Sequence, residues 1–376
     1  MSKVLHEQAR RLGEQLRSNA LPWWARTTDG RYGGYLLAPD EKQLATQSRM
    51  VWAFAHAHRS GLGDYLPVAE QGLAFLLERF RDRRHGGFVW KTDRAGRVRS
   101  DRKILYGQLF VVHALVEYAR AGGDPAALAE ARTLFELLVE RAHDDAYGGW
   151  LEHFGRGWRP PRWSGRGFEV EIPGLKSANT HLHAMEALTE LETETRDPTV
   201  EAMLGETVDL STGHFFPDDP GAAAQHRSRD WRPDGRAGVS LGHNVEFAWL
   251  LLRAERILGR EPSRNRFDAY ISATLEAERP ARIWWEDAEL LAALATGLAE
   301  WPDDRRQEAL SGHLGFLLAH VVDPEDGVWL HTVAADGEPV NTVRSETWKD
   351  AYHEVRATTM LAEALAGGLE LDGRKV

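Results

Sequence analysis

The sequence predicts an all-α protein, a single (α/α)6 barrel in which six helix pairs form a closed ring with short β-hairpins at its mouth. Three observations lead to this fold class. Short glycine–aromatic motifs recur along the chain, and the segments between them have the apolar spacing of amphipathic helices. Alternate helices also begin with polar and aromatic residues, which indicates where the chemistry lies.

Length and composition are those of one globular domain spanning residues 1–376. The chain is 43% hydrophobic and 27% charged, with a net charge of −11. Because no block of Lys or Arg stands out, we expect no nucleic-acid partner. No apolar run is long enough to cross a membrane, so we expect no membrane partner. The charged start does not have the pattern of a signal peptide, so we expect a cytoplasmic protein. We expect it to be a monomer or a homodimer. The absence of cysteine excludes disulfides and thiol catalysis.

The glycine–aromatic motifs mark the repeating unit. They read YGGYLL at 32–37, HGGFVW at 85–90, YGGWLE at 147–152, TGHFFP at 212–217 and DGVWLH at 326–331. The last gap is about twice the others, so we expect one degenerate unit near 265–285, which gives six units. A closed ring needs no capping repeats, and no polar cap is evident at either end, which favours a ring over an open solenoid.

The segments between the motifs read as helices. Apolar residues from Ala69 to Phe80 recur at helical spacing, and Gly and Pro clusters such as Gly122 to Pro125 separate the segments. The predicted helices span 3–19, 44–60, 65–80, 103–121, 125–142, 178–195, 198–209, 241–259, 264–277, 285–300, 303–320 and 346–368.

Alternate helices carry polar and aromatic residues near their starts, which in a ring of this kind open toward one mouth. Residues three or four apart share a helix face, so each group can point at one spot. Singly, each residue has a structural explanation, such as a helix cap for Asn179. Their matched positions in six units favour a functional site. The candidates are Arg49, Trp52, Tyr106, Asn179, His183, His243, Glu246, Trp285, Glu289, Trp348, His353 and Arg356.

The sequence carries no recognisable metal or cofactor motif. His181 and His183 are two residues apart and do not share a helix face, and HEVRA at 353–357 lacks the second histidine of a zinc-binding helix. There is no glycine-rich phosphate-binding pattern. We therefore expect no metal and no cofactor, with side chains alone performing the chemistry.

Seven segments, in order along nearly the whole chain, carry a resemblance to a known family. They are RMVW (49–52), KILYGQLFVVHALVEY (103–118), YGGWLEHF (147–154), NTHLHAMEAL (179–188), GHNVEFAWLLL (242–252), WWEDAE (284–289) and WKDAYHEVRA (348–357). On these the chain resembles the N-acylglucosamine 2-epimerase superfamily, which includes cellobiose and mannose 2-epimerases, mannose isomerases and sulfoquinovose isomerases.

The resemblance implies a barrel that acts on a small-molecule partner, a reducing sugar. By motif position it implies two catalytic histidines, His243 and His353. The motif wording is closer to the 2-epimerases than to the isomerases. The fifth unit departs from the family pattern, because 274–285 is short and Arg282 stands where a lysine is expected, which leaves the substrate size open. Positions similar to the family's sugar contacts are Arg49, Tyr106, Asn179, His183, Glu246, Trp285, Glu289 and Trp348.

These residue types suit proton transfer at C2 of a ring-opened aldose, because the C1 carbonyl can take up the charge. An imidazole can act as base in one direction and as acid in the other, so two of them on opposite faces of C2 give a 2-epimerase. We expect Glu246, one turn from His243, to fix the tautomer of that histidine, and Arg49 to stabilise the enediolate. Trp285 would stack on the sugar.

Three alternatives to a 2-epimerase of D-mannose and D-glucose, or of a β-1,4-linked disaccharide such as cellobiose, remain open. Returning the proton to C1 instead of C2 gives an aldose–ketose isomerase that interconverts D-mannose and D-fructose. A glycoside hydrolase on the same barrel would need two carboxylates, for which Glu246 and Glu289 are the candidates. A sugar-binding protein without catalysis would have no use for the paired histidines.

Overall fold

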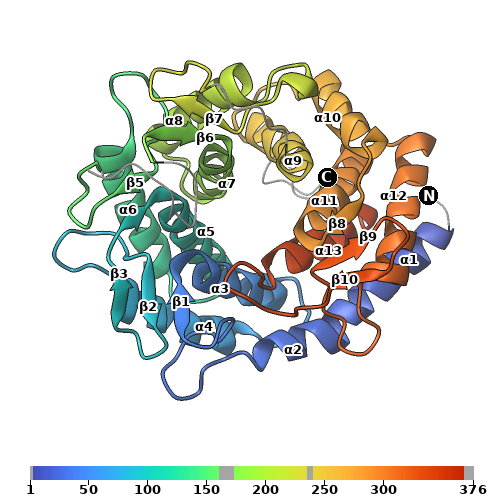
Figure 1. The fold of residues 1–376 in the computed structure, drawn as a ribbon, viewed down its shortest axis with the longest axis horizontal. Helices are drawn as coiled ribbons and strands as arrows, with labels where there is room; N and C mark the ends of the chain where they lie inside the picture. Colours follow the sequence, from blue (N-terminus) through green and yellow to red (C-terminus); the bar gives the residue numbers. More distant parts are fainter. Residues whose placement is uncertain (1–2, 161–172, 235–239, 368–376) are drawn as a thin grey trace.

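A computed structural model describes residues 3–160, 173–234 and 240–367 as two concentric rings of helices (Figure 1). Neighbouring inner helices pack against each other, and α13 packs against α3, which closes the ring. The predicted barrel of six pairs is therefore confirmed, and the open solenoid is excluded. The inner ring consists of α3 (Leu44–Arg59), α5 (Leu105–Arg120), α7 (Ala178–Thr195), α9 (Leu241–Ile257), α11 (Trp284–Glu300) and α13 (Tyr352–Leu365).

The outer ring covers the apolar faces of the inner helices. Four outer helices are extended by a π-helical turn. None of the helices in the described residues has the length and apolar character of a membrane span. The outer elements are α1 (Lys3–Gln15) with η1 (Leu16–Ala20) and α2 (Leu21–Ala25), α4 (Leu66–Phe75) with η2 (Leu76–Phe80), α6 (Ala126–Ala142), α8 (Pro198–Leu210) with η3 (Ser211–Phe215), α10 (Arg264–Glu276), and α12 (Asp304–Phe316) with η5 (Leu317–Val321). A 3-10 turn, η4 (Pro220–Ala222), follows η3.

Short antiparallel strands surround one mouth of the ring. A strand just before an inner helix pairs with a strand of the following unit: β1 with β2, β4 with β5, β6 with β7 and β8 with β9. The start of each of these inner helices is thereby pinned to its neighbour. The strands are β1 (Glu41–Gln43), β2 (Lys91–Asp93), β3 (Val98–Ser100), β4 (Lys103–Ile104), β5 (His153–Phe154), β6 (Leu175–Ser177), β7 (His226–Ser228), β8 (Ala281–Ile283), β9 (Thr332–Ala334) and β10 (Pro339–Asn341).

Two predicted inner helices begin later than expected. The helix predicted from 103 begins at Leu105, because Lys103 belongs to β4. The helix predicted over 346–368 begins at Tyr352, whose backbone N–H donates to the carboxylate of Asp350 at 2.9 Å in the turn that precedes the helix. Trp348 consequently lies in the turn before α13 and not on the helix.

A buried ion cluster, repeated in three units, holds each hairpin against the next. In the third unit the Asp144 carboxylate lies 3.1 Å from the buried ammonium of Lys176 and accepts two hydrogen bonds, at 2.9 and 2.7 Å, from Arg229. Lys176 also donates to the carbonyl of Gly148, in the glycine pair. The equivalent clusters are Asp29 with Lys42 and Arg94, and Asp82 with Lys103 and Arg156.

The hairpins also accept a side chain from the inner helix that follows. Gln47 and Gln108 use their amide groups to bond both the N–H and the C=O of Tyr35 and Phe88. In the third unit His181 takes this place and accepts the N–H of Trp150 at 3.1 Å. His181 is therefore a scaffold residue.

The fifth unit is degenerate, as predicted. Only residues 277–280 separate α10 from β8, and Arg282 replaces the lysine. Arg282 donates to Asp287 at 2.9 Å and lies over the ring of Phe316 at 3.7 Å. A longer cation and a different carboxylate thus perform the anchoring that the hairpin cluster performs elsewhere.

We expect Asp144→Asn to lower the free energy of unfolding by roughly 3–5 kcal/mol, because it leaves the buried Lys176 without its carboxylate. Asp209→Asn is the control, since the ion pair of Asp209 with Arg260 lies at the surface and contributes little. Urea denaturation of both variants measures the difference. Equal stability of the two variants would contradict an anchoring role for the cluster.

Candidate active site

The candidate site lies where the inner helices begin. The first residue of four inner helices donates its N–H to a carbonyl in the following unit: Leu44 to Trp90, Leu105 to Glu152, Ala178 to Gln225 and Trp284 to His331, at 2.8–3.1 Å. These bonds fix the depth and orientation of each helix start. The polar side chains of the first two turns therefore meet inside one mouth of the ring.

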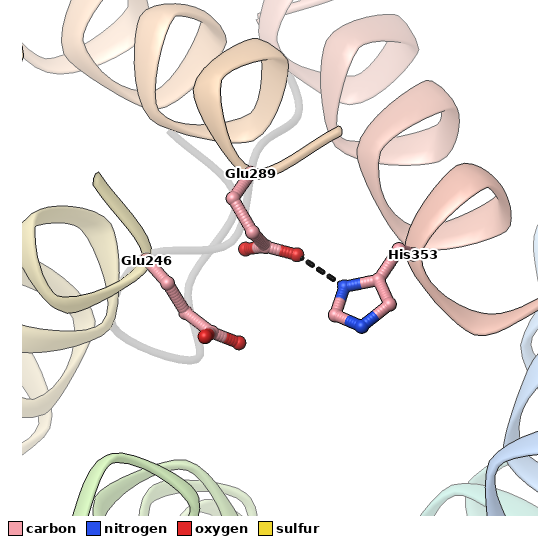
Figure 2. Close-up of side chains that lie close together, drawn as sticks. All are labelled: Glu246, Glu289 and His353. Carbon is pink, nitrogen blue, oxygen red and sulfur yellow. Dashed lines mark hydrogen bonds and ion pairs between the residues drawn. The ribbon is translucent and has the colours of Figure 1, made fainter. Parts of the chain in front are cut away.

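His353 and Glu289 form a buried acid–histidine pair (Figure 2). Nδ1 of His353 lies 2.6 Å from Oε1 of Glu289, and Trp249 donates its indole N–H to the other carboxylate oxygen at 2.9 Å. Burial lowers the pKa of His353, whereas Arg356 and the hydrogen bond from His353 overcome burial and lower the pKa of Glu289 to about 2. The imidazole is therefore neutral near pH 7. Its Nδ1–H donates to an ionised carboxylate, and its lone pair is on Nε2.

Arg356 is the counter-charge for three buried carboxylates on three different helices. Its guanidinium bonds Glu289 at 2.5 Å and Glu246 at 3.2 Å, and it also donates to Glu186 and to the hydroxyl of Tyr352. The prediction placed Arg356 among the sugar contacts. The structure gives it a different principal task, which is to hold the acidic side chains of α7, α9 and α11 together.

Glu246 does not have the predicted partner. It was expected to fix the tautomer of His243, but its Oε1 contacts Arg356 and lies 4.0 Å from Nε2 of His183. The group on Nδ1 of His243 is Oε1 of Gln225, at 2.9 Å. Burial, reinforced by the charge of Glu289, raises the pKa of Glu246 well above its ordinary value.

The two predicted catalytic histidines pack around one tryptophan. The ring of Trp285 lies 5.3 Å from that of His243 and 6.0 Å from that of His353, between ring centres. His243 and Trp285 are half-buried, whereas His353 is buried. The ring therefore brings both imidazoles to the same part of the mouth, although they come from α9 and α13.

His183, Tyr106 and Arg49 form the other side of the site. Glu186 lies 2.9 Å from Nδ1 of His183, and the ring of His183 lies 5.0 Å from that of Tyr106. Arg49 donates to the hydroxyl of Tyr106 and lies 4.3 Å above the ring of Phe110. Within the described part of the chain Nε of Arg49 has no hydrogen-bond partner, so this buried cation keeps a donor for a ligand.

Asn179 and Trp348 lie at the rim. Asn179 is the second residue of α7 and is half-buried. Trp348 is also half-buried, and its ring lies 6.1 Å from Trp90 and 6.2 Å from Tyr106.

Trp52 lies one turn further along α3 than Arg49. Its ring stacks on His56 at 4.4 Å and on His113 at 5.2 Å, and it lies 4.9 Å from the ring of Tyr352. It lines a cavity of about 1060 Å3 that reaches the ends of the inner helices and that Glu186 and Arg356 also line. A contact between Trp52 and the sugar stays a prediction.

Glu246, Glu289 and His353 could in principle hold a metal ion, since they offer ligand atoms within 4.8 Å of one another. Arg356 already provides the positive charge at this point, because it bonds both carboxylates. Nδ1 of His353 is likewise engaged by Glu289. The donor set therefore fits a guanidinium better than a metal, and a metal-free site remains our prediction.

Three residues of the site were missed from the sequence. They are Asp350, Tyr352 and Gln225, whereas Glu186 follows His183 by three residues, the same recognisable spacing as His243 and Glu246. Asp350 and Tyr352 precede His353, and Asp350 lies 3.9 Å from Arg49. Gln225 carries no sequence signal, since its position depends on the pairing of β6 with β7.

We expect His353 to be neutral at pH 6, with its proton on Nδ1. An ordinary histidine, with a pKa of about 6.5, is mostly protonated at that pH, whereas burial lowers the pKa of His353. Nitrogen NMR of histidine-labelled protein measures the state of the ring, and His353→Gln identifies its signals. An imidazolium at pH 6 to 7 would contradict the described pair.

Comparison with known proteins shows the family of the chain. The family model of N-acylglucosamine 2-epimerase (GlcNAc 2-epimerase) matches residues 31–276 and 258–357. A cellobiose 2-epimerase of Bacteroides fragilis is 26% identical over 95% of this chain and 98% of its own, and a D-mannose isomerase of Thermobifida fusca is 25% identical over 86% of each. The solved cellobiose 2-epimerase from Spirochaeta thermophila superposes with a TM-score of 0.87 at 29% identity, over 96% of this chain and 98% of that one. The chain belongs to the N-acylglucosamine 2-epimerase family.

Proposed function

We propose that this chain is a sugar 2-epimerase that interconverts the C2 epimers of a reducing aldose, either D-mannose and D-glucose or a β-1,4-linked disaccharide such as cellobiose. The observation that carries the proposal is the placement of His243 and His353 around the single ring of Trp285. Two imidazoles from different helices at one spot fit a reaction that removes a proton from one face of a carbon and returns one to the other.

The reaction begins with an opened sugar, whose C1 carbonyl makes the C2 hydrogen acidic. One imidazole removes the C2 proton, and the electron pair left at C2 moves into the C1 carbonyl to give an enediolate. In this direction the second imidazole enters the step as the imidazolium and donates its Nε2 proton to the opposite face of C2, so the first imidazole ends protonated and the second ends neutral. His353 is ready to act as the base, because it is neutral and Glu289 stabilises the imidazolium that forms.

Two further groups suit the charge that develops. Arg49 has a buried donor directed at no described residue, and a preorganised donor of this kind stabilises an enediolate oxygen. Oε1 of Glu246 lies 4.0 Å from Nε2 of His183, and burial raises the pKa of Glu246, so this pair suits proton transfer during ring opening. Trp285 and Trp348 offer flat faces to the sugar ring.

An aldose–ketose isomerase is the second candidate, and the D-mannose isomerase of Thermobifida fusca among the relatives is the observation that favours it. The same enediolate yields a ketose when the proton returns to C1. The two outcomes differ in which carbon faces the donating imidazole. The products formed from D-mannose decide between them, since glucose indicates an epimerase and fructose an isomerase.

A glycoside hydrolase fits the geometry poorly. Its two carboxylates flank a glycosidic bond and stand roughly 5–10 Å apart, one on each side of the substrate. Glu246 and Glu289 instead share one guanidinium, that of Arg356, and Glu289 is also bonded to His353. No glycosidic bond can lie between carboxylates that a buried arginine already bridges.

We expect the protein to exchange the C2 hydrogen of its substrate with solvent. Proton NMR of D-mannose, D-glucose and cellobiose in D2O should show loss of the C2–H signal, because the enediolate is protonated from exchangeable histidines. Unchanged signals for every sugar tried would rule out the enediolate. Micromolar sugar binding without exchange would instead indicate a protein that only binds sugar.

We expect His243→Ala and His353→Ala each to slow epimerisation by at least ~100-fold, because each removes one of the two acid–base groups. His58→Ala is the matched control, since His58 lies in the last turn of α3, far from the helix starts, and pairs only with the exposed Asp64 among the described ion pairs. Rates with both C2 epimers, together with circular dichroism to verify folding, complete the measurement. Wild-type rates in either histidine variant would contradict the mechanism.

A further inference from the structure

We infer that Gln225 is a positioning residue for proton transfer, because its amide oxygen holds His243 in the tautomer whose lone pair is on Nε2. The inference rests on the proposed function, in which His243 is one of the two acid–base groups. The amide oxygen lies 2.9 Å from Nδ1 of His243. An amide oxygen only accepts hydrogen bonds, so Nδ1 must carry the proton and Nε2 is left to take the C2 proton.

The backbone fixes Gln225 independently of this contact. Its carbonyl accepts the N–H of Ala178 at 2.8 Å, and the next residue, His226, is paired with Ser177 across β6 and β7. The start of α7 and the tip of the fourth hairpin are therefore joined at Gln225. Gln225 directly precedes β7, so the backbone contacts that place it, the bond from Ala178 and the pairing of β7 with β6, do not involve His243.

The same position recurs around the ring. Trp90, Glu152 and His331 accept the first N–H of an inner helix as Gln225 does. Their side chains also lie at the mouth, where Trp90 packs near Trp348 and Glu152 accepts a hydrogen bond from Ser177. Four of the six inner helices thus have an equivalent acceptor residue at the mouth, and for α7 this residue is a glutamine.

The two histidines are consequently held by different groups. Glu289 presents a charge to His353, whereas Gln225 presents a neutral dipole to His243. Both groups fix a tautomer, but only the carboxylate also stabilises an imidazolium electrostatically. Loss of the Gln225 acceptor should therefore slow proton transfer between His243 and C2 and leave proton transfer between His353 and C2 intact.

This asymmetry gives the experiment its readout. Gln225→Met keeps the length of the side chain and removes the acceptor, and Gln225→Glu keeps an acceptor oxygen. In D2O, we expect Gln225→Met to slow epimerisation roughly 10- to 100-fold while solvent deuterium still enters C2 of one epimer recovered without conversion. Gln225→Glu should return the ratio of exchange to conversion to the wild-type value.

The results that overturn the inference are equally specific. In one such result, Gln225→Met loses deuterium exchange and conversion in parallel, from both epimers, without recovery in Gln225→Glu. That result would mean that Gln225 is structural only. An unchanged rate in Gln225→Met would mean that it plays no part. Nitrogen NMR of the wild-type protein, assigned with His243→Gln, should find the neutral ring protonated on Nδ1, and a proton on Nε2 would refute the assignment. This spectrum tests the contact even if no sugar shows C2 exchange and the proposed function itself fails.

Discussion

The candidate site depends on one buried guanidinium. Glu186, Glu246 and Glu289 come from three inner helices, and burial alone would drive each of them to bind a proton. Arg356 provides the positive charge that lets Glu186 and Glu289 stay ionised, and their pKa values are lowered despite burial. It cannot do so for all three, and the pKa of Glu246 is raised instead. Beside a single cation, three identical side chains thus have different pKa shifts, downward for two of them and upward for the third.

This difference sets the states of the histidines. Each ionised glutamate accepts from Nδ1 of a neutral imidazole, Glu186 from His183 and Glu289 from His353. The lone pairs of both rings are then on Nε2, where proton transfer can occur. Arg356 does not need to touch a substrate to matter, because it maintains the charges that orient the groups that do.

Much of this could be predicted from the sequence, because the relevant signals are local. Helical periodicity and glycine punctuation gave the ring, its six units and the degenerate fifth one. Most of the candidate side chains were found because they recur at helix starts. Local sequence patterns do not predict the distances between side chains on helices that come together only when the ring closes. Glu246 was therefore assigned to His243, its neighbour in the chain, although Arg356 is its neighbour in space.

Two other features have the same origin. Trp52 has the spacing of a site residue, but only the packing of α3 against α5 shows that its ring stacks on His113. Gln225 lies outside every predicted helix, and its role depends on strand register. Side chains whose partners lie on their own helix can thus be predicted from the sequence, whereas side chains whose partners lie across the ring cannot.

The strand pairing that links each unit to the next also bears on how the protein comes apart. An open array of repeats can fray from its ends, because a terminal unit has only one neighbour. Here α13 packs against α3, so the inner ring has no terminal unit. Loss of a unit whose strand pairs with the preceding unit removes the pairing that holds the start of the preceding inner helix. We therefore expect the barrel to unfold as one cooperative unit, so that local unfolding of one unit also separates the catalytic groups of the others.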